Sequence, residues 1–308
     1  MDLKEQIKQL ARENGIDFVG VAPVSRFVNA PEGRKPGDFL PGAESVISMG
    51  VRVSAGPQLT QRLALANKRK RHIAFSYRWF GYGVINMYFL DRASFLVSKL
   101  LDENGEIGVP IVASGVEDLR TGFAAFSNRH AAVAAGLAEF AWNGLAITPE
   151  AGVRARFVSV ITTAQLDPDP MYSGPRLCDP KKCAEELGDG VPVCAKLCPL
   201  NAFDLENTVE VDYGERKYTY ALMDRQKCGK AAGQGMHPKA LGPDYMGAYI
   251  PEKVDYEAWL RFKEKMPPEY WLETVTYGRG NFCGVCFLRC PVGAPEMVDE
   301  IMKDIERD

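Results

Sequence analysis

The chain has 308 residues, of which 46% are hydrophobic and 25% are charged, and it carries a formal net charge of −3. This length and composition predict a globular protein with a full hydrophobic core, organised as one large domain with a smaller one or a large insertion. No apolar stretch approaches the length of a membrane span, and the slightly acidic balance gives no basic field for nucleic acid, so we expect neither as a partner.

Residues 1–165 alternate between helical and extended patterns. In chain order we expect a helix over 3–14, strands over 17–23 and 45–51, a helical region over 59–104 broken at Gly81–Gly83, a strand over 110–113, a helix over 127–140 and a strand over 155–162. Ser127 is the expected N-cap of the 127–140 helix. Strands interleaved with helices predict an α/β domain over residues 1–165.

The second part of the chain, residues 166–308, is predicted to form a smaller domain. Proline and glycine punctuate it, and it ends in an expected helix over 295–306. Residues 231–280 contain no cysteine and are interpreted as an aromatic-rich insertion. Because all eight cysteines lie in this part, we expect metal–ligand bonds to replace much of its apolar core.

The eight cysteines fall into two runs, each of which closes on Cys-x3-Cys-Pro. The first run is Cys178, Cys183, Cys194 and Cys198, and the second is Cys228, Cys283, Cys286 and Cys290. A four-iron cluster needs four thiolates that converge on one cube, and short cysteine turns point neighbouring sulfurs inward together. The proline after the last cysteine stops the turn from continuing as a helix. The pattern therefore predicts two 4Fe-4S clusters.

In two-cluster ferredoxins the last cysteine of one run binds the cluster of the other run. That rule assigns Cys178, Cys183, Cys194 and Cys290 to one cluster, and Cys198, Cys228, Cys283 and Cys286 to the other. The first run is spaced more loosely than the compact ferredoxin pattern, which leaves open whether Cys183 is a ligand.

Zinc, disulfides and plain buried thiols are the alternatives for these cysteines. Two four-cysteine zinc sites fit the count, but zinc ribbons favour paired Cys-x2-Cys turns and have no reason to repeat Cys-x3-Cys-Pro. Disulfides require an oxidising compartment, and the opening residues Met1–Gln6 contain no apolar export signal, so we expect a cytoplasmic protein.

Several segments resemble the epoxyqueuosine reductase and reductive dehalogenase superfamily over most of the chain. They are the opening helix, residues 17–22, 129–145, 147–149 and 154–162, and the double cysteine motif. The resemblance implies an α+β nitroreductase-like domain that binds a corrinoid (cobalamin), followed by a ferredoxin-like domain with two 4Fe-4S clusters, one of them next to the cobalt. It also implies an oxidoreductase that acts on a small-molecule substrate and takes electrons from a low-potential donor such as ferredoxin or flavodoxin.

The chain also departs from that family. Gly122 occupies the position at which epoxyqueuosine reductases carry an acid, and the chain ends soon after Cys290, where a tRNA-binding extension would begin. The twin-arginine export signal of respiratory dehalogenases is absent from the sequence. We therefore expect a related reductase of unassigned substrate, with tRNA an unlikely one.

Candidate active-site residues lie in the first domain. Tyr77, Tyr82 and His130 are candidate proton donors, Tyr82 and Tyr77 by analogy with the dehalogenase tyrosine and His130 because an imidazole titrates near neutral pH. The candidate cofactor or anion contacts are Arg129, Asn143, Arg154 and Arg156. Each has a structural alternative, namely a packed aromatic cluster for the tyrosines and a hydrogen-bonded structural role for His130.

The small residues of the 127–140 helix admit two interpretations. Ala131, Ala132, Ala134, Ala135 and Gly136 leave room either for a large flat ring or for close helix–sheet packing. The sequence also leaves two rival functions open. One is a corrinoid-free electron-transfer or maturation protein, and the other is a flavin-dependent reductase, although no Gly-x-Gly-x-x-Gly motif marks a nucleotide site.

Overall fold

The computed structural model describes residues 2–66, 73–114, 124–188, 190–225, 227–228, 283–303 and 305. The expected insertion at 231–280 and the position of Gly122 lie outside these residues. The described part is a mixed structure of helices and antiparallel sheets, so within the predicted α/β class it has the α+β character that the resemblance implies.

The centre of the fold is a four-stranded sheet with the strand order β1-β2-β6-β3. Its strands are β1 (Phe18–Pro23), β2 (Ser45–Arg52), β3 (Gly108–Ile111) and β6 (Ala155–Thr162), and every neighbouring pair is antiparallel. β1 and β6 lie within the expected strands and β2 ends one residue later than expected, whereas β3 begins and ends two residues before the expected 110–113. Ile47 of β2 pairs with Val21 of β1 and Val160 of β6, and β2 is buried along nearly its whole length, which shows that both faces of the sheet are covered.

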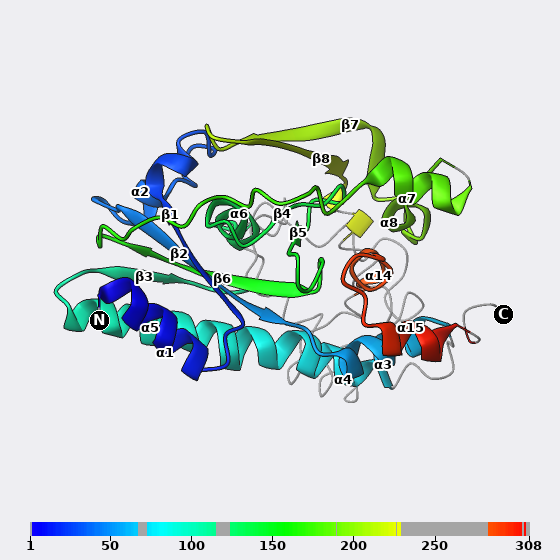
Figure 1. Cartoon of the computed structure of the whole chain (residues 1–308), viewed down its shortest axis with the longest axis horizontal. Coiled ribbons are helices and arrows are strands. Elements are labelled where there is room, and N and C mark those ends of the chain that lie inside the picture. The colour runs from blue at the N-terminus through cyan, green and yellow to red at the C-terminus, as the bar shows by residue number, and fades with distance from the viewer. Residues whose placement is uncertain are drawn as a thin grey trace, which may run out of the picture.

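The remaining elements of the first part are helical or short. They are α1 (Leu3–Glu13), the 3₁₀ turn η1 (Val24–Phe27), α2 (Pro36–Phe39), α3 (Ala55–Ala66), α4 (Phe75–Arg78), the π-helical turns η3 (Trp79–Gly83) and η4 (Ile85–Leu90), α5 (Asp91–Glu103), α6 (Asn128–Ala134), and the two-stranded pair β4 (Glu139–Phe140) and β5 (Ala146–Ile147). α1 and α5 lie on one side of the sheet, whereas α6 lies on the other (Figure 1).

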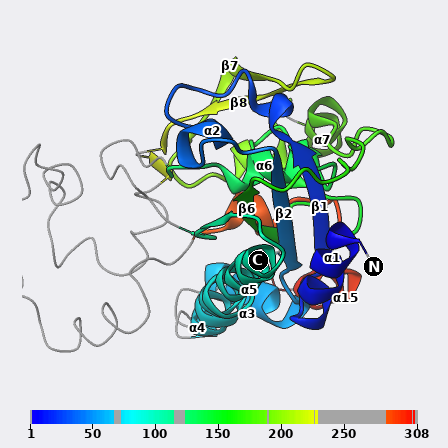
Figure 2. The ribbon, with the colours of Figure 1, turned by 90° about the vertical axis from the view of Figure 1, so that its left-hand side faces the viewer.

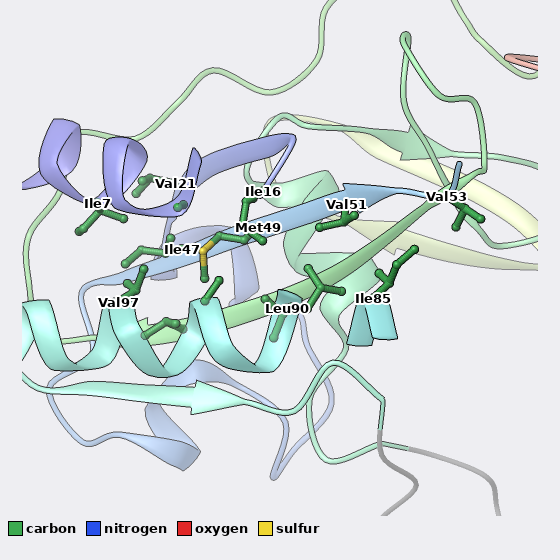
Figure 3. Packing of buried hydrophobic residues seen from close by; sticks show 14 of the residues in the cluster. Ile7, Ile16, Val21, Ile47, Met49, Val51, Val53, Ile85, Leu90 and Val97 are labelled. Carbon is green, nitrogen blue, oxygen red and sulfur yellow. The ribbon is translucent and has the colours of Figure 1, made fainter. Parts of the chain in front are cut away.

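Apolar side chains fill the space between the sheet and the helices α1 and α5. Figure 3 shows Ile7 of α1, Ile47 and Met49 of β2 and Val97 of α5 gathered in one layer, and all four are fully buried. α1 begins where the Asp2 carboxylate accepts a hydrogen bond from the Glu5 backbone N–H at 2.8 Å, a cap that contributes about 1 kcal/mol. The helix expected over 3–14 therefore begins at the predicted residue and ends one residue early.

The expected break at Gly81–Gly83 is wrong. The backbone continues from α4 through η3 and η4 into α5 without leaving the helical region, and it widens into π-helical turns instead of ending. Gly81 is needed for packing, because a Cβ there would collide with the ring of Tyr77. Gly81, which indicated a break in the sequence, thus lies where two helical turns pack closely together.

α6 is shorter than the helix expected over 127–140. It begins at Ser127, whose hydroxyl caps the His130 backbone N–H as expected, but it ends at Ala134. Gly136 has φ +76°, and a Cβ there would collide with the carbonyl oxygen of Pro170, so the chain turns at this point and enters β4. The alanines of α6 are buried against the sheet and do not line the cavity described below, so their small size serves close packing.

In the described residues, the second part contains short helices and one hairpin. The sequence predicted the last of these helices but not the hairpin. The helices are α7 (Pro180–Leu187), α8 (Val193–Lys196), α14 (Val285–Leu288) and α15 (Glu296–Met302), the last of which lies within the expected 295–306 helix. The hairpin consists of β7 (Phe203–Asp212) and β8 (Lys217–Met223) and lies over the α6 side of the sheet, as Figure 2 also shows. Within the described residues, no helix has the length and apolar character needed to cross a bilayer.

Candidate functional site

A cavity of about 1200 Å³ opens on the α6 side of the sheet. Its walls come from η1, η3 and η4, the start of α6, β6, both strands of the hairpin and Phe287 of α14. Four of the sequence-predicted residues line it, namely Tyr82, Arg129, His130 and Arg156. The volume exceeds the roughly 300–1,000 Å³ of most small-molecule pockets, so the cavity can hold a large cofactor together with a small substrate.

Tyr82 and Arg156 form a stacked pair in the cavity wall. The guanidinium carbon of Arg156 lies 4.3 Å from the centre of the Tyr82 ring, and Arg156 Nε donates to the Gly81 carbonyl at 2.7 Å. The Tyr82 hydroxyl is hydrogen-bonded to the Ser114 hydroxyl. The phenol oxygen is therefore held in place while the ring supports a cation.

Tyr77 lies behind this pair, outside the cavity. Its side chain is only 2% exposed, and its hydroxyl accepts a hydrogen bond from Arg156 Nη2 at 3.3 Å. Burial raises the pKa of Tyr77, although the adjacent Arg156 opposes the shift. Tyr77 thus supports Arg156 from behind, whereas Tyr82 presents its phenol at the cavity.

His130 is packed between aromatic rings at the start of α6. Its Nδ1 shares a hydrogen bond of 2.6 Å with the Ser127 hydroxyl, and its ring centre lies 4.8 Å from that of Phe140. Burial, together with the nearby charges of Arg129 and Arg225, lowers the pKa of His130 to about 3. The imidazole is neutral at physiological pH, so it holds no imidazolium proton to donate.

Arg129 lies between the cavity and the second run of cysteines. Its Nη1 donates to the Gly144 carbonyl at 2.8 Å. Burial lowers the pKa of Arg129, while Tyr220 and the thiols of Cys228 and Cys286 act in the opposite direction. Arg129 therefore lines the cavity and is also within electrostatic range of these thiols.

Arg154 and Asn143 contact the cysteine loops and do not line the cavity. Arg154, which is 1% exposed, donates from its terminal nitrogens to the carbonyls of Leu288, Cys290 and Val292 at 3.0, 2.5 and 2.8 Å. Asn143 donates to the Cys286 carbonyl at 3.5 Å. Both residues thus hold the backbone around cysteines, which differs from the direct cofactor or anion contact that the sequence suggested.

All eight cysteines are free thiols, and, except at Cys194, the thiols that raise one another's pKa belong to the same set of the crossover prediction. In the first set, burial, with smaller contributions from the thiols of Cys290 and Cys183, raises the pKa of Cys178 to about 11. Burial also raises the pKa of Cys194, with contributions first from Cys286 and then from Cys178, Cys290 and Cys183. The crossover assignment of Cys178, Cys183, Cys194 and Cys290 to one cluster stays a prediction.

The second set consists of Cys198, Cys228, Cys283 and Cys286. Burial, with contributions from Cys228, Cys283 and Cys198, raises the pKa of Cys286 to about 12. Burial likewise raises the pKa of Cys283, again with contributions from Cys228 and Cys198. The two sets meet at one point, because Cys286 also raises the pKa of Cys194.

Backbone N–H groups point at several of these sulfurs. Trp142 N–H donates to Cys178 Sγ at 3.3 Å, and Ala202 N–H donates to Cys198 Sγ at 3.2 Å. The buried carboxylate of Glu139 in turn accepts from the N–H groups of Leu177 and Cys178 at 2.6 and 3.3 Å. Within the described ranges, no three Cys, His, Asp or Glu side chains converge as closely as one metal ion requires.

Sequence reasoning missed several residues of this site. Arg225 and Tyr220 line the cavity beside Arg129, and Glu139 anchors the loop of Cys178. Arg225 stands three positions before Cys228, and that spacing was the available signal. Tyr220 and Glu139 carried none, because strands β8 and β4 place them there only after folding.

No family model matches the chain, and no curated protein matches it. Among solved structures, the catabolic reductive dehalogenase NpRdhA is similar over 98% of this chain and 36% of its own, with 13% identity and a TM-score of 0.50. Epoxyqueuosine reductases from Streptococcus thermophilus and Bacillus subtilis are 16% and 15% identical, with TM-scores of 0.47 and 0.46. They are matched over 96% and 99% of this chain and over 68% and 87% of their own.

At such low identity these likenesses concern the fold alone. The dehalogenase match shows that the described chain shares its fold, and it thereby confirms the resemblance drawn from the sequence at that level. The chain spans about a third of the length of the dehalogenase, 36% in this comparison.

Proposed function

We propose that this chain is an iron–sulfur oxidoreductase in which two 4Fe-4S clusters pass electrons to a corrinoid in the cavity, where a small-molecule substrate is reduced. The observation that carries the proposal is the position of Arg129. It lines the cavity together with Phe287, the residue that follows Cys286, and the thiols of Cys228 and Cys286 act on its pKa, which supports a second thiol set beside the cavity. Electron transfer requires such proximity.

The two thiol sets fit two clusters. Each set combines cysteines from both runs, as the crossover arrangement of two-cluster ferredoxins requires. The N–H groups that point at Cys178 and Cys198 are typical of cluster environments, where hydrogen bonds to sulfur tune the reduction potential. Electrons would enter at the first set and leave through the second, because Cys194 and Cys286 adjoin one another and only the second set adjoins Arg129.

The cavity fits a corrinoid by its size and by an unused donor in its wall. Asn86 is 4% exposed and lines the cavity, yet its Nδ2 has no hydrogen-bond partner among the described residues. A buried amide nitrogen in this position requires an acceptor, which a bound cofactor or substrate would provide. A corrinoid supplies a strongly reducing cobalt centre, which suits the reduction of poorly reactive bonds.

Tyr82 is the proposed proton donor. Its phenol stands at the cavity wall, held by Ser114 and stacked under Arg156, whose charge favours transfer of the phenol proton. Tyr77 keeps Arg156 in place from behind. His130 is assigned a structural role, because a neutral imidazole bonded to Ser127 has no acidic proton in the working pH range.

The donor and the substrate follow from this arrangement. A low-potential carrier such as ferredoxin or flavodoxin would reduce the clusters. The substrate must fit beside the corrinoid in a cavity of about 1200 Å³, which suits a small molecule. A corrinoid-free electron carrier and a flavin-dependent reductase are the alternatives that the test must separate.

Metal and cofactor analysis of anaerobically purified protein tests the proposal. We expect about eight irons per chain, an absorption near ~400 nm that dithionite bleaches, and one cobalt per chain retained through gel filtration after incubation with hydroxocobalamin. Zinc as the dominant metal would refute the clusters. Intact clusters without cobalamin binding would favour the carrier, and retention of added flavin in its place would favour the flavin enzyme.

A further inference from the structure

One end of the cavity concentrates positive charge. Arg34, Arg129 and Arg225 all line the cavity wall. Burial lowers the pKa of Arg225, and the charges of Arg129 and Arg34 also lower it while Tyr220 and Cys228 oppose the shift, so Arg225 lies within electrostatic range of both other guanidinium groups. Burial and the charges of Arg129 and Arg225 also lower the pKa of the adjacent His130, to about 3, so the imidazole adds no further positive charge there.

The carboxylates of the same cavity wall are engaged elsewhere. Asp212 and Glu210 form ion pairs with Lys217 at 3.0 and 3.3 Å. Asp224 pairs with Lys227 at 3.9 Å and also accepts from the Lys227 backbone N–H at 3.0 Å. None of these carboxylates is among the groups that shift the pKa of Arg129, Arg225 or His130.

Arg129 is the central member of the group. Among the described residues, its Nη1 donates to the Gly144 carbonyl, and no carboxylate there pairs with it. A guanidinium offers five N–H donors in a planar fork that matches a carboxylate or a phosphate. Its remaining donors therefore suit an anion that enters the cavity.

We propose that the Arg129–Arg225 end of the cavity binds an oxyanion, either a carboxylate or a phosphate, carried by the molecule that the cavity holds. The inference deepens the proposed function, on which it rests for the identity of that molecule. Two sources share this chemistry. The oxyanion belongs either to the substrate or to the phosphate in the nucleotide part of a complete corrinoid.

The test uses cluster-loaded, anaerobic protein and compares Arg129→Gln and Arg225→Gln with the matched control Arg12→Gln, an exposed arginine of α1. Calorimetric titration with inorganic phosphate and with benzoate measures the site without any corrinoid. Binding of hydroxocobalamin and of cobinamide, which lacks the nucleotide phosphate, then distinguishes the two sources. Arg129→Lys, which keeps the charge but loses the fork, guards against a variant that merely fails to fold.

We expect the wild type and Arg12→Gln to bind phosphate or benzoate and both glutamine variants to bind at least tenfold more weakly, with Arg129→Lys between them. If the oxyanion is the corrinoid phosphate, Arg129→Gln weakens cobalamin binding and leaves cobinamide binding unchanged; if it is a substrate group, both corrinoids bind the variant as they bind the wild type. Anion binding by a protein that binds no corrinoid would support this site while refuting the proposed function. Equal anion affinity in all variants, or no anion binding by the wild type, would overturn the inference. The positive charge of Arg129 would then act only on the neighbouring thiols.

Discussion

Arg156 stacks on the ring of Tyr82 with its guanidinium carbon 4.3 Å from the ring centre, and both side chains line the same cavity. The pair comes from β6 and from a π-helical turn, far apart in the sequence. A phenol beside a fixed cation is well placed to give up its proton to a substrate, and this arrangement leads to the first prediction.

Replacing Tyr82 by phenylalanine removes the hydroxyl and keeps the ring that supports Arg156. We expect turnover to fall about 100-fold or more, the size of a lost general acid, with iron content and corrinoid binding unchanged. Steady-state rates with a reduced electron donor measure the effect. Tyr88→Phe is the matched control, because Tyr88 belongs to the adjoining π-helical turn and is exposed. Full activity in Tyr82→Phe would assign the proton to another donor.

His130 predicts a pH dependence of stability. Its folded pKa of about 3 lies below the value of about 6.5 in an unfolded chain, so the unfolded state takes up the proton first as the pH falls. Stability from this group is therefore complete above about pH 6.5 and is lost as the pH falls towards 3. The unfolding midpoint of the wild type should drop more between pH 7 and 5.5 than that of His130→Gln. Parallel drops would show that the folded imidazole titrates normally.

Arg154 predicts a coupling between a buried arginine and the cluster loop. Arg154→Lys leaves at least one of the carbonyls of Leu288, Cys290 and Val292 unpaired, at a cost of about 3 kcal/mol. The variant should lose iron from the cluster that includes Cys290 and unfold at a lower temperature. Arg52→Lys, at an exposed position on β2, should do neither. Normal iron content in Arg154→Lys would mean that the loop holds its shape without these bonds.

The assignment of cysteines to two mixed sets predicts an asymmetric effect of single replacements. Cys290→Ser should damage the cluster bound by Cys178 and Cys194 and spare the one bound by Cys283 and Cys286. Cys198→Ser should do the opposite. Electron paramagnetic resonance of the reduced protein resolves the two signals, together with iron analysis. The reverse pattern would show that each run binds its own cluster.

Much of the fold followed from sequence because local patterns and tertiary packing agree there. The four strands of the central sheet and the opening helix have the periodicity that their burial requires. Gly136 and Gly81 were misjudged for opposite reasons. Gly136 ends α6 because its positive φ and its contact with Pro170 exclude a side chain, whereas Gly81 lies inside a continuous helical run because only glycine fits beside Tyr77. Both reasons are tertiary contacts that a single sequence does not display.

The candidate site was predicted unevenly for a similar reason. The cysteine spacing carried its own chemistry, and Tyr82, Arg129, His130 and Arg156 do line one cavity. From the sequence, Arg154 and Asn143 could not be distinguished from residues that line the cavity. They differ from those residues because the folded cysteine loops lie against their side chains. Arg225 was overlooked since its role depends on the β7–β8 hairpin, which the sequence did not reveal.

The central claim is that a corrinoid in the cavity lies next to the cluster bound by Cys198, Cys228, Cys283 and Cys286. Its most direct test is the electron paramagnetic resonance signal of divalent cobalt in protein loaded with cobalamin, recorded with the clusters oxidised and with the clusters reduced. The account predicts that reducing the clusters broadens the cobalt signal or speeds its relaxation, because the two spin centres are neighbours. A cobalt signal indifferent to cluster reduction, in protein that retains about eight irons and one cobalt per chain, would contradict it.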